Sequence, residues 1–141
     1  GVKEDPSVAI QWFLKAAEQG DADSQVRVGL MYDMGDGVTK NNAEALKWFL
    51  KAADQGNAVA QSCIGRMYFY GSGVPKDYST AFKWYLKAAE NGNDYAPFTV
   101  AEMYEKGQGV EKNIDKAVYW YKKGAEKNRN DCKEALKRLG Y

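Results

Sequence analysis

Apolar residues recur along this chain with the spacing of amphipathic helices, and the pattern repeats every 36 residues. The second unit shows two such sets. The first occupies the positions Ala45, Leu46, Phe49, Leu50, Ala52 and Ala53. The second occupies the positions Ala60, Ile64, Met67 and Tyr68. Residues spaced three, four, seven and eight apart share one face of a helix, so each unit is predicted to hold two helices.

The repeat runs without gaps from one end of the chain to the other. Four tryptophans fall at equivalent positions, Trp12, Trp48, Trp84 and Trp120. Self-similarity at this period is typical of a solenoid, in which each unit buries its apolar face against its neighbours. We therefore predict an all-α solenoid and place the four tryptophans in its core.

Polar residues mark the helix starts. The first helix of each unit is expected to begin at a side chain that accepts hydrogen bonds from the free N–H groups of the first turn, Asp5, Asn41, Asp77 or Asn113. Asn41 followed by Glu44 predicts a capping box. In the second helix of the third unit, Pro97 disfavours helical geometry at Ala96. That helix is predicted to start late or to bend.

Two patterns of small residues are expected to serve packing and turning. Gly29, Gly65 and Ala101 share a column where a larger side chain would hold neighbouring helices apart. The motif Gly-x-Gly-Val follows each second helix, for example at 71–74. A phosphate-binding loop would follow a strand and carry a third glycine or a Gly-Lys-Ser/Thr ending, and this motif does neither. We interpret it as a turn whose valine fills the contact between units.

Composition excludes several classes of function. The 20 Lys and Arg against 19 Asp and Glu give a net charge of +1, which argues against nucleic-acid binding. No apolar run approaches the length needed to cross a membrane, so membrane insertion is not expected. Cys63 and Cys132 stand at different places in the repeat, and helix layers about 8–10 Å apart would keep them too distant for a disulfide. Two free thiols favour a reducing, cytoplasmic compartment, while a periplasmic or secreted location stays open.

The chain offers little for catalysis, metal binding or a cofactor. It contains no histidine, the commonest general base and metal ligand. Two lone cysteines make neither a zinc site nor a cysteine–histidine nucleophile. The acidic column Glu18, Asp54, Glu90 and Glu126 is interpreted as a solvated helix face pairing with the lysines three residues earlier. We expect no enzyme activity and no cofactor.

These motifs resemble the Sel-one-like repeat family, a relative of the tetratricopeptide repeats. The shared pattern combines Gly-x-Met-Tyr, Gly-x-Gly-Val, a tryptophan and a final Ala-Ala pair, and it covers essentially the whole chain. The resemblance implies a right-handed superhelical solenoid of stacked antiparallel helix pairs with about eight helices. It divides the single domain 1–141 into a half repeat 1–20, whole repeats 21–56, 57–92 and 93–128, and a capping helix in 129–141. Lys137 fills the small-residue column and would block further stacking, whereas Gly1 aligns with Gly37, so we expect the C-terminal portion of a longer protein.

The resemblance further implies a protein-interaction scaffold or adaptor, often bacterial, that holds a partner peptide or helix on its concave face. Variable side chains on the Gly-x-Met-Tyr helices would line that face. The candidate partner-binding residues are Arg27, Leu30, Met34, Arg66, Phe69, Tyr70 and Glu102. Aromatic residues and arginine dominate binding hot spots. Alternatively, Phe69 and Tyr70 pack beneath the 71–75 linker or against Tyr78.

Two other functions remain open. The chain could be a structural spacer or a self-associating arm of a longer repeat protein, although a monomer is expected. Some cysteine-rich members of the family are regarded as β-lactam-binding hydrolases. Their repeats carry a regular cysteine pair that this sequence lacks, which disfavours that function here.

Overall fold

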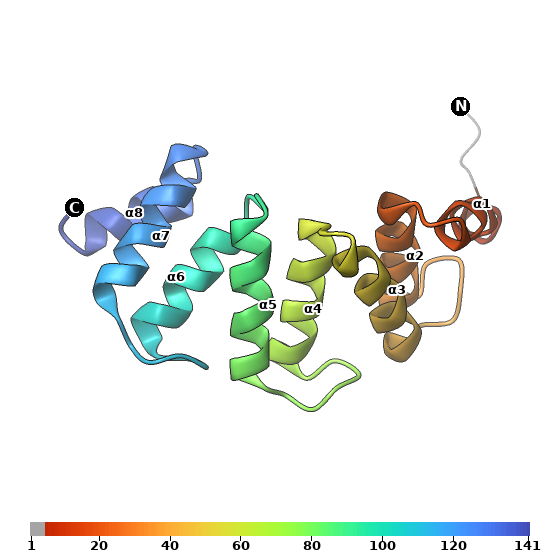
Figure 1. Cartoon of the computed structure of the whole chain (residues 1–141), viewed down its shortest axis with the longest axis horizontal. Helices are drawn as coiled ribbons and strands as arrows, with labels where there is room; N and C mark the ends of the chain where they lie inside the picture. The colour runs from red at the N-terminus through yellow and green to blue at the C-terminus, as the bar shows by residue number, and fades with distance from the viewer. Residues whose placement is uncertain (1–4) are drawn as a thin grey trace.

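The computed structural model describes residues 5–141, and within that range the chain forms α-helices and no strand (Figure 1). The helices, in chain order, are α1 (Pro6–Glu18), α2 (Ala22–Met34), α3 (Asn42–Asp54), α4 (Ala58–Tyr70), α5 (Tyr78–Glu90), α6 (Ala96–Lys106), α7 (Ile114–Glu126) and α8 (Asn130–Arg138). Residues 1–4 lie outside the described range, and with them the expected loop position of Gly1.

The helices stack as antiparallel pairs into a right-handed superhelical solenoid, which confirms the predicted fold class. Each helix packs mainly on the helices next to it in sequence, and the chain advances from α1 at one end of the molecule to α8 at the other (Figure 1). We refer to α2, α4, α6 and α8 as the even helices and to α1, α3, α5 and α7 as the odd helices.

The predicted caps start the odd helices. Asn41 Oδ1 accepts a hydrogen bond from the Glu44 amide at 3.1 Å. The reciprocal half of the capping box is wrong, because the Asn41 amide donates instead to the carbonyl of Tyr32 at 2.9 Å, and the Glu44 carboxylate pairs with Lys47. Equivalent amide bonds close the next two linkers, so the end of each even helix is tied to the start of the following odd helix.

Helix α6 starts late, as Pro97 predicted. It begins at Ala96, whereas α4 begins at Ala58, two residues earlier in the repeat. Asn93 Oδ1 caps this displaced start and accepts from the amides of Tyr95 and Ala96 at 3.0 and 2.8 Å. Pro97 falls in the first turn, where its missing N–H is not needed.

Small residues permit close packing inside each unit, also as predicted. A β-carbon added to Gly29 would lie 2.6 Å from the ring of Phe49, and one added to Gly65 would lie 3.0 Å from the ring of Tyr85. In the linkers, a β-carbon on Gly73 would lie 2.5 Å from Asn42, in the first turn of the odd helix one unit earlier. Gly73 has a φ of +72°, which few other residues adopt, so the Gly-x-Gly-Val motif serves a turn.

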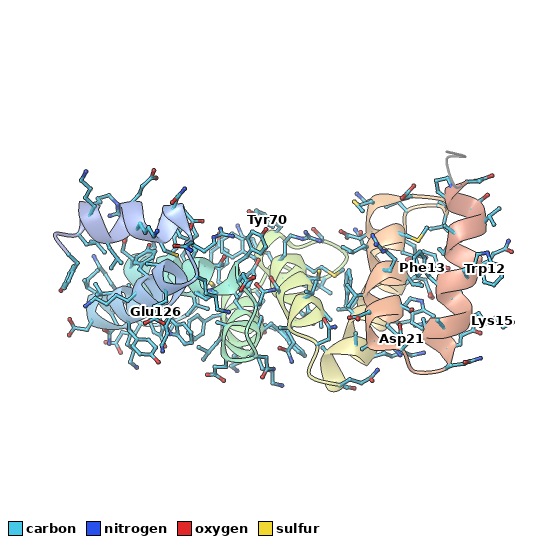
Figure 2. All side chains as sticks on the ribbon, turned by 90° about the horizontal axis from the view of Figure 1, so that it is seen from above. Trp12, Phe13, Lys15, Asp21, Tyr70 and Glu126 are labelled. Carbon is cyan, nitrogen blue, oxygen red and sulfur yellow. The ribbon has the colours of Figure 1, made fainter. Side chains whose placement is uncertain are left out.

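The tryptophans differ along the array. Trp48 is 8% exposed and packs on Ala17 and Val28 of the preceding helices, while Trp84 and Trp120 are half-buried. The prediction is wrong for Trp12, which is 71% exposed. Figure 2 shows Trp12 pointing outward from α1 and its neighbour Phe13 pointing inward. Within the described residues, no preceding helix pair lies on that side of α1 to cover Trp12.

Buried amides connect successive units, a feature that the sequence analysis missed. Gln61 Nε2 donates to the carbonyl of Ala53 at 3.3 Å, and Gln61 Oε1 accepts from Asn91 Nδ2 at 2.9 Å. Gln25 makes the equivalent bonds one unit earlier, to the Ala17 carbonyl and to Gln55. These bonds satisfy polar groups buried where helix pairs meet.

A candidate partner-binding face on the even helices

All seven predicted partner-binding residues lie on α2, α4 and α6, which are neighbours on one face of the solenoid. Two cross-helix ion pairs show that the even helices lie side by side. Arg66 on α4 reaches Asp33 on α2, with Nη2 3.0 Å from Oδ2. Arg138 on α8 reaches Glu105 on α6, with Nη2 2.7 Å from Oε1. We call this surface the even-helix face.

Between α4 and α6 the cross-helix ion pair is missing. The position equivalent to Asp33 holds Phe69, and the position equivalent to Arg66 holds Glu102. A pocket of about 240 Å³ opens there instead. We call it the α4–α6 pocket. It is lined by Phe69, Tyr70, Tyr85, Phe98, Thr99 and Glu102.

The two aromatic residues at the end of α4 have different roles. The Phe69 ring is half-buried and packs on Tyr78, with ring centroids 4.9 Å apart. This contact is the packing arrangement that the sequence analysis left open. Tyr70 is 69% exposed, touches Phe69 edge-on at 5.0 Å, and lies at the outer edge of the ribbon (Figure 2). An aromatic ring this exposed is available to a partner.

Glu102 provides the charge of the α4–α6 pocket. Its side chain is 35% exposed and its Oε1 lies 3.5 Å from Nζ of Lys106, one turn later on the same helix. Such an exposed pair within one helix contributes only a few tenths of a kcal/mol. The carboxylate is thus held loosely on its own helix rather than locked across the junction.

The other predicted residues lie elsewhere on the even-helix face. Arg66 lines a larger hollow of about 510 Å³, between α4 and the start of α6. Arg27 lines a third hollow near α1, with its guanidinium 5.5 Å from the centroid of the Phe13 ring. Leu30 is half-buried against the core, and Met34 is exposed. The structure therefore brings Phe69, Tyr70 and Glu102 together and leaves the other four outside their pocket.

Phe98 was not among the predicted residues, and it lies between the α4–α6 pocket and a neighbouring hollow of about 370 Å³ over α8. Its column reads Val26, Ser62, Phe98 and Glu134, so the residue type changes in every unit. That variability was the available signal. Cys63, also on α4, is buried and belongs to the hydrophobic core.

No group of three or more Asp, Glu and Cys side chains within 5–141 is arranged to hold a metal ion. Both cysteines are free, as predicted, and both are buried. Burial raises the pKa of the Cys63 thiol and raises the pKa of Cys132 to about 12, so both thiols stay protonated near neutral pH. A protonated thiol is a poor nucleophile.

The acidic column is exposed, as expected, but its pairing with lysines is not observed. Lys51 and Lys87 turn toward aromatic rings, with Nζ 4.4 Å from the ring centroid of Trp48 and 5.1 Å from that of Trp84. A lysine over an indole gains a cation–π interaction and covers apolar surface. Within the described range, no helix is both long and apolar enough to cross a membrane.

Comparison with known proteins places these features in context. The sequence model of the Sel1 repeat family matches this chain at residues 1–21, 22–57, 58–93 and 98–128. A Sel1 repeat protein from Oxalobacter formigenes is 42% identical, with a TM-score of 0.85 over 94% of this chain and 54% of its own. A protective antigen present in uropathogenic Escherichia coli strains is also 42% identical, with a TM-score of 0.86 over 89% of this chain and 27% of its own.

A third solved structure shows the fold alone. Cysteine rich protein B of Helicobacter pylori is 24% identical, with a TM-score of 0.75 over 96% of this chain and 98% of its own. No curated protein matches the sequence. The chain spans about half of the Oxalobacter protein and about a quarter of the Escherichia coli antigen.

Proposed function

Because this chain belongs to the Sel1 repeat family, whose members are generally protein–protein interaction modules, we propose that it is a non-enzymatic scaffold or adaptor. In this proposal a peptide segment or a helix of another protein lies along the concave, even-helix face. The division into a half repeat, three whole repeats and a capping helix is part of the same proposal. The partner crosses the repeats and contacts several units at once.

One observation carries the proposal. Tyr70 is 69% exposed at the mouth of a pocket that has aromatic walls and a single carboxylate. Binding surfaces are enriched in exposed aromatic residues that supply large contact areas at little entropic cost. Arg66, four residues before Tyr70 on α4, and Phe98 on α6 extend the surface. Arg27, Leu30 and Met34 extend it to α2.

A peptide-display experiment tests the proposed function. Random short peptides displayed on phage are selected against the purified chain, and bound peptides are located by NMR chemical-shift changes. We expect shifts to concentrate on α4 and α6 and binding to be lost in Tyr70→Ala. Tyr119→Ala is the matched control, because Tyr119 is also exposed, at 54%, but lies on α7. Peptides that bind equally to both variants would refute the assignment of this face.

Self-association is the second candidate, and one observation favours it. Trp12 and Val8 are both exposed on the same helix, α1. Solution scattering at several protein concentrations separates the two functions. A concentration-dependent mass that Trp12→Ala abolishes would support an associating arm. The hydrolase alternative predicts turnover of the chromogenic β-lactam nitrocefin, which we do not expect.

A further inference from the structure

Two of the three junctions between neighbouring even helices are closed by an arginine–carboxylate pair, and the third is not. At the junction of α4 and α6 the equivalent positions hold Phe69 and Glu102. A carboxylate thus faces an aromatic ring where the repeat elsewhere pairs opposite charges. The missing element at this junction is a cation.

The walls of the α4–α6 pocket suit the stem of a long cationic side chain. Rings of Phe69, Tyr70 and Phe98 line it, and Glu102 is the only Asp, Glu, Lys or Arg among its lining residues. Lysine and arginine bury their methylene stems along apolar surface and are attracted to aromatic faces. The volume of about 240 Å³ lies below the range of drug-sized ligand sites and fits one side chain.

The charges around the α4–α6 pocket also favour a cationic side chain as its occupant. The arginines on the neighbouring even helices are already paired, Arg66 with Asp33 at 3.0 Å and Arg138, which shares a hollow with Glu102, with Glu105 at 2.7 Å. Glu102 is paired only with Lys106, at 3.5 Å and half-exposed, so an incoming cation can replace that contact at little cost. An apolar side chain would strip water from the Glu102 carboxylate without pairing it, which is unfavourable. An acidic side chain would be repelled.

We propose that the α4–α6 pocket binds a lysine or arginine side chain of the partner protein, with its cationic group on Glu102 and its stem between the aromatic rings. The proposal rests on the proposed function, because it names the chemistry of a partner segment on the same face. At the neighbouring junctions an arginine of the chain itself pairs with a carboxylate. At this junction the partner protein would supply the cation that pairs with Glu102.

The test uses the full chain and peptides selected from the random display library. We expect selected peptides to be enriched in one lysine or arginine flanked by apolar residues. Binding of a synthetic peptide is then measured by fluorescence anisotropy with its basic residue present or replaced by norleucine. The replacement should weaken binding by about tenfold, the effect of losing a charge-assisted contact.

Variants of the chain, combined with the two peptides, make a double-mutant cycle. Glu102→Gln should weaken binding of the lysine peptide by a similar factor and should not weaken binding of the norleucine peptide, because it removes the carboxylate that an apolar side chain would desolvate. Glu44→Gln is the matched control, because Glu44 is also half-exposed and pairs with a lysine of its own helix, at 3.3 Å. Lys106→Ala removes the internal competitor and should tighten binding of the lysine peptide.

The outcomes separate the two proposals. Peptides that shift resonances of α4 and α6 but show no basic enrichment and no response to Glu102→Gln would overturn the cation pocket and leave the scaffold function standing. Selection of no peptide, or of peptides that bind elsewhere on the chain, would overturn both.

Discussion

A β-carbon on Gly124 would overlap the sulfur atom of Cys132, so the glycine on α7 makes room for the thiol on α8. The equivalent residues one unit earlier are Ala88 and Ala96, both fully buried. A smaller residue on one helix thus accompanies a larger one on the next, and the substitution of alanine by Gly124 has a packing reason.

Gly124→Ala should destabilise the chain even though alanine favours helix by about 1 kcal/mol over glycine. Overpacking against Cys132 in a buried contact costs about 1–3 kcal/mol, which exceeds that gain. Urea denaturation measures the difference in unfolding free energy. The double variant Gly124→Ala with Cys132→Ala recreates the alanine pair and should recover most of the loss. Additive effects of the two substitutions would contradict the contact.

Trp12 and Trp48 occupy the same column but should respond differently to truncation. Trp48→Ala removes a side chain that is 8% exposed and is expected to cost about 3–5 kcal/mol. Trp12→Ala should change stability by less than about 1 kcal/mol, because that ring is largely in water. Thermal unfolding by circular dichroism compares the pair. Equal losses would mean that Trp12 is covered in solution.

Gln61→Ala should destabilise the contact between its two units. The substitution removes two hydrogen bonds, one to the Ala53 carbonyl, which keeps its bond from the Gly56 amide, and one from the side-chain amide of Asn91. At about 0.5–1.5 kcal/mol for each bond, the expected loss is about 1–3 kcal/mol. Asn91→Ala removes only one of the two bonds and serves as the comparison, with a smaller expected loss. Urea denaturation again provides the measurement, and equal stability of Gln61→Ala and the unmodified chain would refute this role.

The buried thiol of Cys132 predicts a loss of stability at alkaline pH. Its pKa in the folded chain, about 12, lies above the reference value of 9.0, so the folded state disfavours the thiolate. The contribution is complete below pH 9.0 and is lost as pH rises toward 12, because the unfolded chain releases its proton first. Cys132→Ala should flatten this decline. Burial also raises the pKa of Tyr85 and Tyr121, which leaves a residual slope.

Phe69→Ala and Tyr70→Ala should separate packing from recognition. Phe69 packs on Tyr78 and the core, so its loss is expected to lower the unfolding free energy by about 2–4 kcal/mol. Tyr70 is mostly in water, so Tyr70→Ala should leave stability within about 0.5–1 kcal/mol while abolishing peptide binding. Differential scanning calorimetry combined with anisotropy distinguishes the outcomes. A large stability loss in Tyr70→Ala would assign that ring to packing.

The sequence predicted the architecture well because every unit restates it. The caps, the linker glycines and the small-residue column each recur, and recurrence turns weak local signals into strong ones. The late start of α6 was also predicted from Pro97, but Ala96, which the proline was expected to keep out of the helix, is its first residue. The wrong core assignment of Trp12 has a different cause. Periodicity predicts an average unit and does not show which units have a neighbour on both sides among the described residues.

The candidate site could be predicted only in part from the sequence, for a related reason. Exposure at Tyr70 followed from its column, but the pocket beside it depends on Phe98, which belongs to another column and another helix. Nothing in a linear period shows that α4 and α6 meet at Phe69 and Glu102. The glutamine bonds were missed likewise, because they join residues 30 positions apart across two units.

The ion pairs across the even helices also make the units non-interchangeable. Asp33 is matched to Arg66 and Glu105 to Arg138, whereas Phe69 stands opposite Glu102, so the middle junction is not equivalent to the other two. Excising residues 57–92 would preserve the helical period yet set Asp33 against Glu102, two like charges. The charges on the even helices thus distinguish units that are otherwise similar. Shuffling them would keep the shape of the array and lose the order of its binding surface.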